Sequence, residues 1–266
     1  MKKLTTTTLF LAILFNTVIN AQVEKKLTKT LELVIPREGG ANGASVTWHP
    51  DQKKYYAAMA GNTSFFFGVY DVKGKLLSPE ELSTKFDVRG MWYNGNTKTI
   101  QVNGYSDYGW AEYILDEKGF PSDVKVLYKD KFQPFEQSVG TFNKKEDLVY
   151  FLNADGNIDV YELDGALYSD EIELKLGITR QSGEAADNAA VIENYDPSSP
   201  IYTGDRIGLL NHQQRQIELY DLETGYMTHK LILPADAIVP DFLNFAYANG
   251  IYWLFDKTAR IWKGYK

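Results

Sequence analysis

The stretch Arg206–Pro234, RIGLLN-HQQR-QIELYDLETGYMTHKLILP, carries the pattern that decides the fold. It predicts three β-strands, the first two joined by a short loop and the last two by a tight turn that closes at Gly225. Similar units recur at Lys54–Leu77, Thr99–Phe120 and Leu148–Leu174, and a shorter one, Ile251–Lys266, ends the chain. Repetition at this period is typical of a propeller, in which each small sheet cannot bury its own face alone.

Each repeat also has a candidate innermost strand upstream, followed by turn-forming residues. These candidates are Ser45–Trp48, Val88–Tyr93, Ser138–Phe142, Ala189–Asn194 and Phe242–Tyr247. Their starts lie about 43 to 53 residues apart, near the period of four-stranded blades. The sequence therefore predicts an all-β fold, a β-propeller of five four-stranded blades, or of six if one loop contains a degenerate unit.

The two ends of the chain complement each other. The LELVIP end of Lys25–Pro36 resembles the KLILP end of the Arg206 unit, whereas the last unit stops at Lys266, where the others turn into a final strand. We expect the N-terminal strand to pair with the last blade and close the ring. Closure leaves fewer unpaired sheet edges, which are a hazard in open β-sheets.

The first residues have the pattern of a secretory signal peptide. Lys2 and Lys3 precede an apolar run, Leu9–Ile19, and Ala21 marks the expected cleavage site. The run is shorter than the ~20 residues that span a bilayer, so we expect no membrane span in the mature chain. We predict a signal peptide over 1–21, a single propeller domain over 22–266, and export to the periplasm or the cell exterior.

Composition narrows the classes of partner. The chain has no Cys, so it has neither disulfides nor thiolate metal sites. Without Lys2 and Lys3, 26 basic residues face 35 acidic ones, a formal charge of about −9 that disfavours nucleic acid. The three His residues are widely separated, and no zinc-protease, nucleophile-elbow, dinucleotide-binding or P-loop motif is present. We expect a monomer.

A recurring turn carries a family resemblance. Tyr70–Gly74, Asp116–Gly119 and Tyr220-Asp221 with Gly225 share a Tyr-Asp or Asp start and a closing Gly. This turn resembles the repeats of bacterial extracytoplasmic β-propellers of the broad NHL and YVTN kind, over most of the mature chain. The resemblance implies the fold but no single function, because propellers include enzymes, lectins and docking platforms. No repeat carries the Trp-Asp or Gly-His signature of WD40 proteins, so their scaffolding role is not implied.

Four acidic residues are candidates for catalysis. Propeller sites usually lie on the loop face, where the connections between blades meet the loops between second and third strands. Four acids occupy comparable places in successive connections: Asp87, Glu136, Asp187 and Asp241. A glycoside hydrolase needs two carboxyl groups that flank the scissile bond. The first inner strand offers no such acid, and the alternative is that these carboxylates cap strand ends in solvent.

One loop has a partial calcium pattern. Its oxygen-bearing side chains alternate in Asn153, Asp155, Asn157 and Asp159. Ile158 stands where a calcium loop of the EF-hand type requires Gly, and Asp155-Gly156 between two alternating strands favours a hairpin turn. We therefore expect no metal and no cofactor, with Ca²⁺ as the alternative.

The loop Gly104–Trp110 concentrates aromatic side chains suited to stacking on a sugar or anchoring a partner. The predicted ligand-binding residues are Tyr105, Asp107, Tyr108 and Trp110 in this loop, with Arg89, His212 and Arg215 from neighbouring connections. We predict an exported, non-catalytic propeller that recognises a glycan, a peptide or an envelope protein through its loop face. The alternatives are a hydrolase of carbohydrates or lactones that uses the axial carboxylates, and a structural subunit of an envelope assembly.

Overall fold

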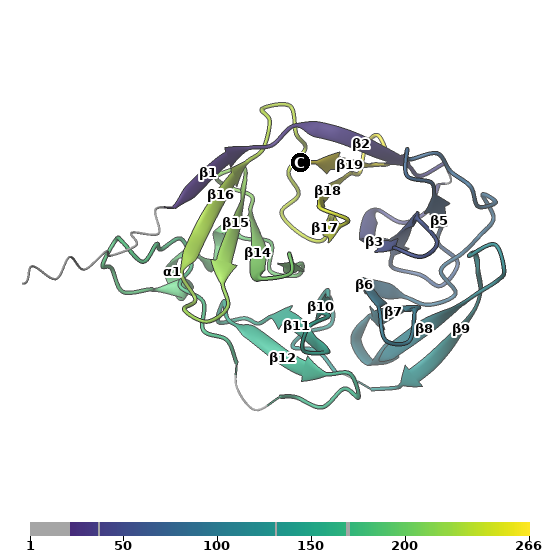
Figure 1. The fold of residues 1–266 in the computed structure, drawn as a ribbon, viewed down its shortest axis with the longest axis horizontal. Coiled ribbons are helices and arrows are strands. Elements are labelled where there is room, and N and C mark those ends of the chain that lie inside the picture. The colour runs from purple at the N-terminus through teal and green to yellow at the C-terminus, as the bar shows by residue number, and fades with distance from the viewer. Residues whose placement is uncertain (1–21, 37, 131, 169–170) are drawn as a thin grey trace, which may run out of the picture.

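Five β-sheets stand around a central axis in the computed structural model, which forms a five-bladed β-propeller (Figure 1). The structure describes residues 22–36, 38–130, 132–168 and 171–266. The predicted signal peptide, 1–21, lies outside the described residues. The prediction of five blades is confirmed, and the alternative of six is wrong.

The blades follow one another along the chain. Blades I and II contain β3 (Asn42–His49), β4 (Lys54–Ala60), β5 (Phe67–Tyr70), then β6 (Val88–Asn94), β7 (Thr99–Gly104), β8 (Trp110–Leu115) and β9 (Pro121–Tyr128). Blade III contains β10 (Thr141–Asn143), β11 (Leu148–Leu152) and β12 (Ile158–Glu162). Blades IV and V contain β13 (Ile201–Tyr202), β14 (Arg206–Asn211), β15 (Gln216–Asp221), β16 (Met227–Ile232), then β17 (Phe245–Ala248), β18 (Ile251–Asp256) and β19 (Ile261–Tyr265). Gly225 closes the β15–β16 turn with a φ of 70°, a conformation that glycine adopts without strain.

The N-terminal segment closes the ring as predicted. β2 (Lys29–Val34) pairs antiparallel with β19 and becomes the outer strand of blade V. A further strand, β1 (Val23–Lys26), pairs parallel with β16 on blade IV. The sequence did not predict β1. The segment from β1 to β2 therefore runs across the outer edges of two neighbouring blades (Figure 1).

The apolar core is divided among the blade interfaces. Five clusters of buried side chains each join residues of two neighbouring blades. Between blades V and I, for example, Trp253 and Trp262 pack with Tyr55 and Leu33. Since no blade buries its faces alone, each sheet depends on both neighbours for its stability.

One inner strand lies elsewhere than predicted. The residues predicted as the inner strand of blade IV, Ala189–Asn194, lie instead in α1 (Asn188–Val191) and the 3-10 helix η2 (Ile192–Asn194). The strand that pairs with β14 is β13, after Pro197 and Pro200. The Asn-Ala-Ala-Val start of this segment suits a helix at least as well as a strand, since Ala has the highest helix propensity.

Two blades depart in detail from the expected four strands. Among the described residues, blades I and III have three strands each, and isolated bridges such as Tyr70 to Leu76 and Tyr161 to Leu167 lie at the fourth position. In blade I the outer segment contains Pro79, which has no amide hydrogen to donate to a ladder. No helix within the described ranges is long and apolar enough to cross a membrane.

Candidate functional site

One aromatic residue occupies the same place in every blade. It lies near the end of the inner strand, just before the hairpin that leads to the second strand: Trp48, Tyr93, Phe142, Tyr202 and Tyr247. In register, Trp48 faces Tyr55, Tyr93 faces Ile100 and Phe142 faces Val149. The five inner strands surround the axis, so these five residues come together at one end of it. We call them the axial aromatic residues.

The axial aromatic residues surround a pocket of about 390 Å³. All five of these residues line this pocket, together with Met91, Trp92 and residues of the inner hairpins of blades I, III, IV and V. The volume lies in the range of small-molecule sites. The pocket opens on the hairpin face, which is opposite to the loop face where the sequence predicted the site.

Contacts within and between blades hold the side chains of the axial aromatic residues in place. Tyr93 packs on His49 of blade I, with ring centroids 4.5 Å apart, and Phe142 stacks on Trp92 of blade II at 6.3 Å. Within blade I, Trp48 lies 4.6 Å from Tyr55. Trp48, Tyr93 and Tyr247 are half-buried, so their remaining surface is open to a ligand.

The polar groups of the axial pocket are few and mostly neutral. Lys144 is the single charged side chain among the described residues that line it, and none of them is acidic. Burial raises the pKa of the Tyr202 and Tyr247 hydroxyls above the usual range, so both stay protonated near neutral pH. Such a pocket can stack on a ring and donate hydrogen bonds, but its described lining includes no pair of carboxyl groups for hydrolysis.

Four of the predicted site residues meet on the loop face. The Arg89 Nη1 donates to the Asp87 carboxylate at 2.6 Å, and its guanidinium carbon lies 4.8 Å from the centroid of the Tyr105 ring. The Tyr105 hydroxyl in turn donates to Glu136 Oε2 at 2.7 Å. Asp87 and Arg89 are buried. These contacts run from Asp87 through Arg89 and Tyr105 to Glu136. They connect blade II to the segment before blade III.

The other two candidate acids lie apart from this group. Asp187 precedes α1, which Figure 1 shows at the outside of the ring, so the prediction of an axial position for Asp187 is wrong. It followed from the misplaced inner strand of blade IV. Asp241 is exposed and lines a different cleft on the loop face, together with His212. The four carboxylates therefore do not converge on the axis.

Two predicted ligand-binding residues have their side chains engaged inside the protein. Trp110 is 1% exposed and packs against Trp92 at 5.6 Å, so a ligand cannot reach it. The Arg215 guanidinium donates to the carbonyls of Pro234, Ala235 and Ala237, and so ties two loops of blade IV together. Of the remaining loop residues, Asp107 and Tyr108 are exposed.

The candidate calcium loop is the hairpin between β11 and β12. Asn153 Oδ1 accepts the backbone N–H groups of Asp155 and Asn157, while its amide nitrogen donates to Asp159. These bonds occupy oxygens that a calcium ion would need. Across the described residues no group of three or more His, Asp or Glu side chains is placed to hold a metal.

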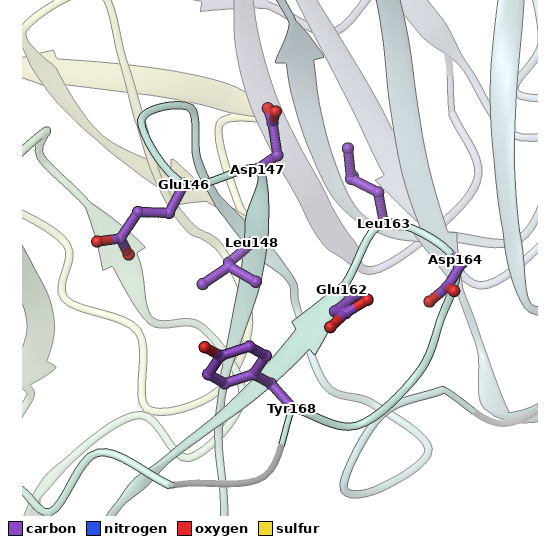
Figure 2. A pocket seen from close by; sticks show the side chains of 7 residues that line it. All are labelled: Glu146, Asp147, Leu148, Glu162, Leu163, Asp164 and Tyr168. Carbon is purple, nitrogen blue, oxygen red and sulfur yellow. The ribbon is translucent and has the colours of Figure 1, made fainter.

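A larger hollow, about 730 Å³, lies on the hairpin face of blade III. Figure 2 shows its four acidic residues, Glu146, Asp147, Glu162 and Asp164, and the carboxyl groups of the first two point away from those of the other two. Asp147 accepts hydrogen bonds from Asn96 of the neighbouring blade. This hollow gathers acids without directing them to a shared point, so we assign it no chemistry.

The sequence contains a signal for the axial aromatic residues. In each inner strand the aromatic residue stands just ahead of the turn residues, as in Trp48-His49-Pro50, Tyr93-Asn94-Gly95 and Phe142-Asn143. In blade IV the same pattern, Tyr202-Thr203-Gly204, lies downstream of Ala189–Asn194, which the sequence predicts as the inner strand.

Comparison with known proteins supports the fold. No protein-family model matches the chain, and no curated protein matches it. Among solved structures it is similar to the glutaminyl cyclase of Myxococcus xanthus, with a TM-score of 0.57 and 10% identity over 92% of this chain and 97% of that one. It is also similar to a Bacteroides thetaiotaomicron protein of unknown function, with a TM-score of 0.48 and 9% identity over 84% of this chain and 58% of that one. Since identity to the cyclase is so low, this likeness shows the propeller fold alone.

Proposed function

We propose that the protein is a non-catalytic binding propeller and that the axial pocket on its hairpin face holds the end of a glycan. The observation that carries this proposal is the set of axial aromatic residues, because each of the five blades places one aromatic side chain at a single pocket. Aromatic faces stack on the apolar face of a sugar ring, while hydroxyl, amide and ammonium groups at the rim bond its hydroxyls.

The neutral lining of the axial pocket supports binding in preference to hydrolysis. A glycosidase requires an acid and a base or nucleophile beside the scissile bond, and the described lining of the axial pocket contains neither Asp nor Glu. Its polar side chains include Thr203, Lys144 and Asn249, which suit recognition. A hydrolase that uses Asp87 and Glu136 on the loop face is the alternative from a different class.

The test is a titration of residues 22–266 with gluco-, manno-, xylo- and chito-oligosaccharides, followed by melting temperature and calorimetry. A ligand at a hundred times its dissociation constant adds ~2.7 kcal/mol to the free energy of unfolding, which is visible as a thermal shift. In a Trp48→Ala/Tyr247→Ala variant the shift should be lost, because each stacked ring contributes about 0.5–1.5 kcal/mol beyond its buried area.

A matched control lies on the opposite face. The Tyr105→Ala/Tyr108→Ala variant removes two rings from the loop face and should keep the thermal shift. Loss of binding in this control alone would place the glycan on the loop face, and absence of a shift with every glycan would refute the proposal. Release of shortened sugars would instead establish the hydrolase.

We also propose that the protein acts as an exported monomer outside the cytoplasm. The pattern of Lys2, Lys3 and the apolar run before Ala21 supports export. N-terminal sequencing of the protein recovered from the periplasm or the medium tests this, and a mature terminus other than Gln22 would move the cleavage site.

A further inference from the structure

A second cleft lies on the loop face, between blades III and IV. Its volume is about 670 Å³. Its walls come from three connections between blades and from the β11–β12 and β14–β15 loops. The connections supply Phe135, Ile192, Glu193, Tyr195, Pro197 and Asp241. It belongs to a different face from the axial pocket and shares no lining residue with it.

One part of the wall of this cleft is apolar. Phe135 and Ile192 are half-buried, Pro197 is exposed, and Tyr195 is buried. The Tyr195 hydroxyl donates to the buried Glu218 carboxylate at 2.7 Å, so it is already engaged within blade IV. The helical insert η2, which the sequence did not predict, supplies Ile192 and so builds one wall.

The charges of the cleft have one sign. Glu193 and Asp241 are both exposed, and neither side chain has an ion pair or hydrogen bond within the described part of the chain. No Lys or Arg is among the described lining residues. His212, which also lines the cleft, has its Nε2 3.0 Å from the Glu193 carbonyl oxygen.

From this combination we infer that the cleft binds a basic peptide segment in which Lys or Arg adjoins an apolar residue. The apolar side chain would pack on Phe135 and Ile192, and the cation would meet Glu193 and Asp241. Exposed ion pairs are weak on their own, so the apolar contact has to supply much of the affinity. Both halves of such a ligand are therefore required.

The experiment uses a fluorescein-labelled, end-capped peptide of alternating Leu and Arg, titrated with the mature protein at low salt. Fluorescence anisotropy should show saturable binding. A peptide with citrulline in place of Arg, which keeps the shape but removes the charge, should bind at least tenfold more weakly. A peptide with Gly in place of Leu should lose affinity to a similar extent.

Matched variants locate the site. Glu193→Gln/Asp241→Asn should weaken binding at least fivefold, whereas Glu162→Gln/Asp164→Asn, which removes two carboxylates from the hairpin face of blade III, should change it less than twofold. The Trp48→Ala/Tyr247→Ala variant should bind the peptide normally, since the axial pocket is separate. All of these variants replace residues that are at least partly exposed, and their melting temperatures check that each is folded.

Two results would overturn the inference. One is the absence of saturable binding to the wild-type protein at millimolar concentration. The other is an equal loss of affinity in the two carboxamide variants, because this would show attraction to the acidic protein as a whole rather than to the cleft.

Discussion

Leu33 of β2 lies directly opposite Trp262 of β19, and both side chains are completely buried. The two residues come from opposite ends of the chain, and both belong to the cluster between blades V and I. The ring is therefore closed by a contact in the apolar core as well as by backbone hydrogen bonds.

Replacing Leu33 with Ala should lower the free energy of unfolding by about 2–5 kcal/mol, because the change removes buried methyl groups and leaves a cavity. Val34→Ala is the control, since Val34 lies next to it on the same strand but is 50% exposed. We expect the control to cost less than about 0.5 kcal/mol. Urea denaturation measures both, and equal costs would mean that β2 does not close the core.

Asp196 should make stability depend on pH. It is 1% exposed, its Oδ1 accepts hydrogen bonds from the backbone and side chain of Ser198, and its Oδ2 has no partner within the described residues. Burial raises the pKa of this carboxyl to about 6 from its ordinary value of 3.8. The folded state therefore holds the proton more tightly than the unfolded state.

Because the folded pKa lies above the unfolded one, this contribution to stability is present at pH 4 and is lost as the pH rises through about 6. The loss should amount to roughly 3 kcal/mol. Asp196→Asn keeps an oxygen for Ser198 and cannot ionise, so its stability relative to the wild type should increase by this amount between pH 4 and pH 7. Denaturation of both proteins across this range tests the expectation, which fails if the difference stays constant.

Glu218 anchors a buried network in blade IV. Its carboxylate accepts the hydroxyls of Tyr195 and Tyr220 and the amides of Asn211 and Gln216. In Glu218→Gln an amide nitrogen replaces one accepting oxygen and faces donors. We expect a loss of about 1–3 kcal/mol, which is the cost of a buried donor without an acceptor. The exposed Glu162→Gln serves as the control, and similar stability of the two variants would argue against the network.

Replacing Trp110 and replacing Tyr108 should have different effects on stability, although the two residues stand only two positions apart. Trp110→Ala removes a 1% exposed ring from the interface of blades II and III and should cost about 3–5 kcal/mol. Tyr108 is 41% exposed and touches Phe86 at its edge, so Tyr108→Ala should cost less than about 1 kcal/mol. Thermal unfolding of the two variants gives the comparison, and comparable shifts would contradict the assigned burial.

Local patterns predicted most of the blades correctly. The three strands read from Arg206–Pro234 are β14, β15 and β16, and the turn closes at Gly225 as expected. The alternation of side chains and the chemistry of the turns act over a few residues, so a single unit contains the information for its own hairpins. The same approach failed at Ala189–Asn194, where the apolar residues form short helices rather than a strand.

The candidate sites are formed by residues that lie far apart in the sequence. Trp48 and Tyr247 lie in different repeats, and they share a pocket because five inner strands end around one axis. Trp110 and Tyr108 are both aromatic loop-end residues in the sequence, yet the neighbouring blade covers only Trp110.

The sequence by itself determined the repeat, its strands and turns, and the closure of the ring by the N-terminal strand, because these follow from periodicity and from the backbone preferences of Gly, Asn and Asp. Only the tertiary structure decided which side chains line the pockets on the two faces and which side chains remain accessible. Accessibility depends on how neighbouring blades pack, and that packing joins residues some fifty positions apart through contacts that no single repeat specifies.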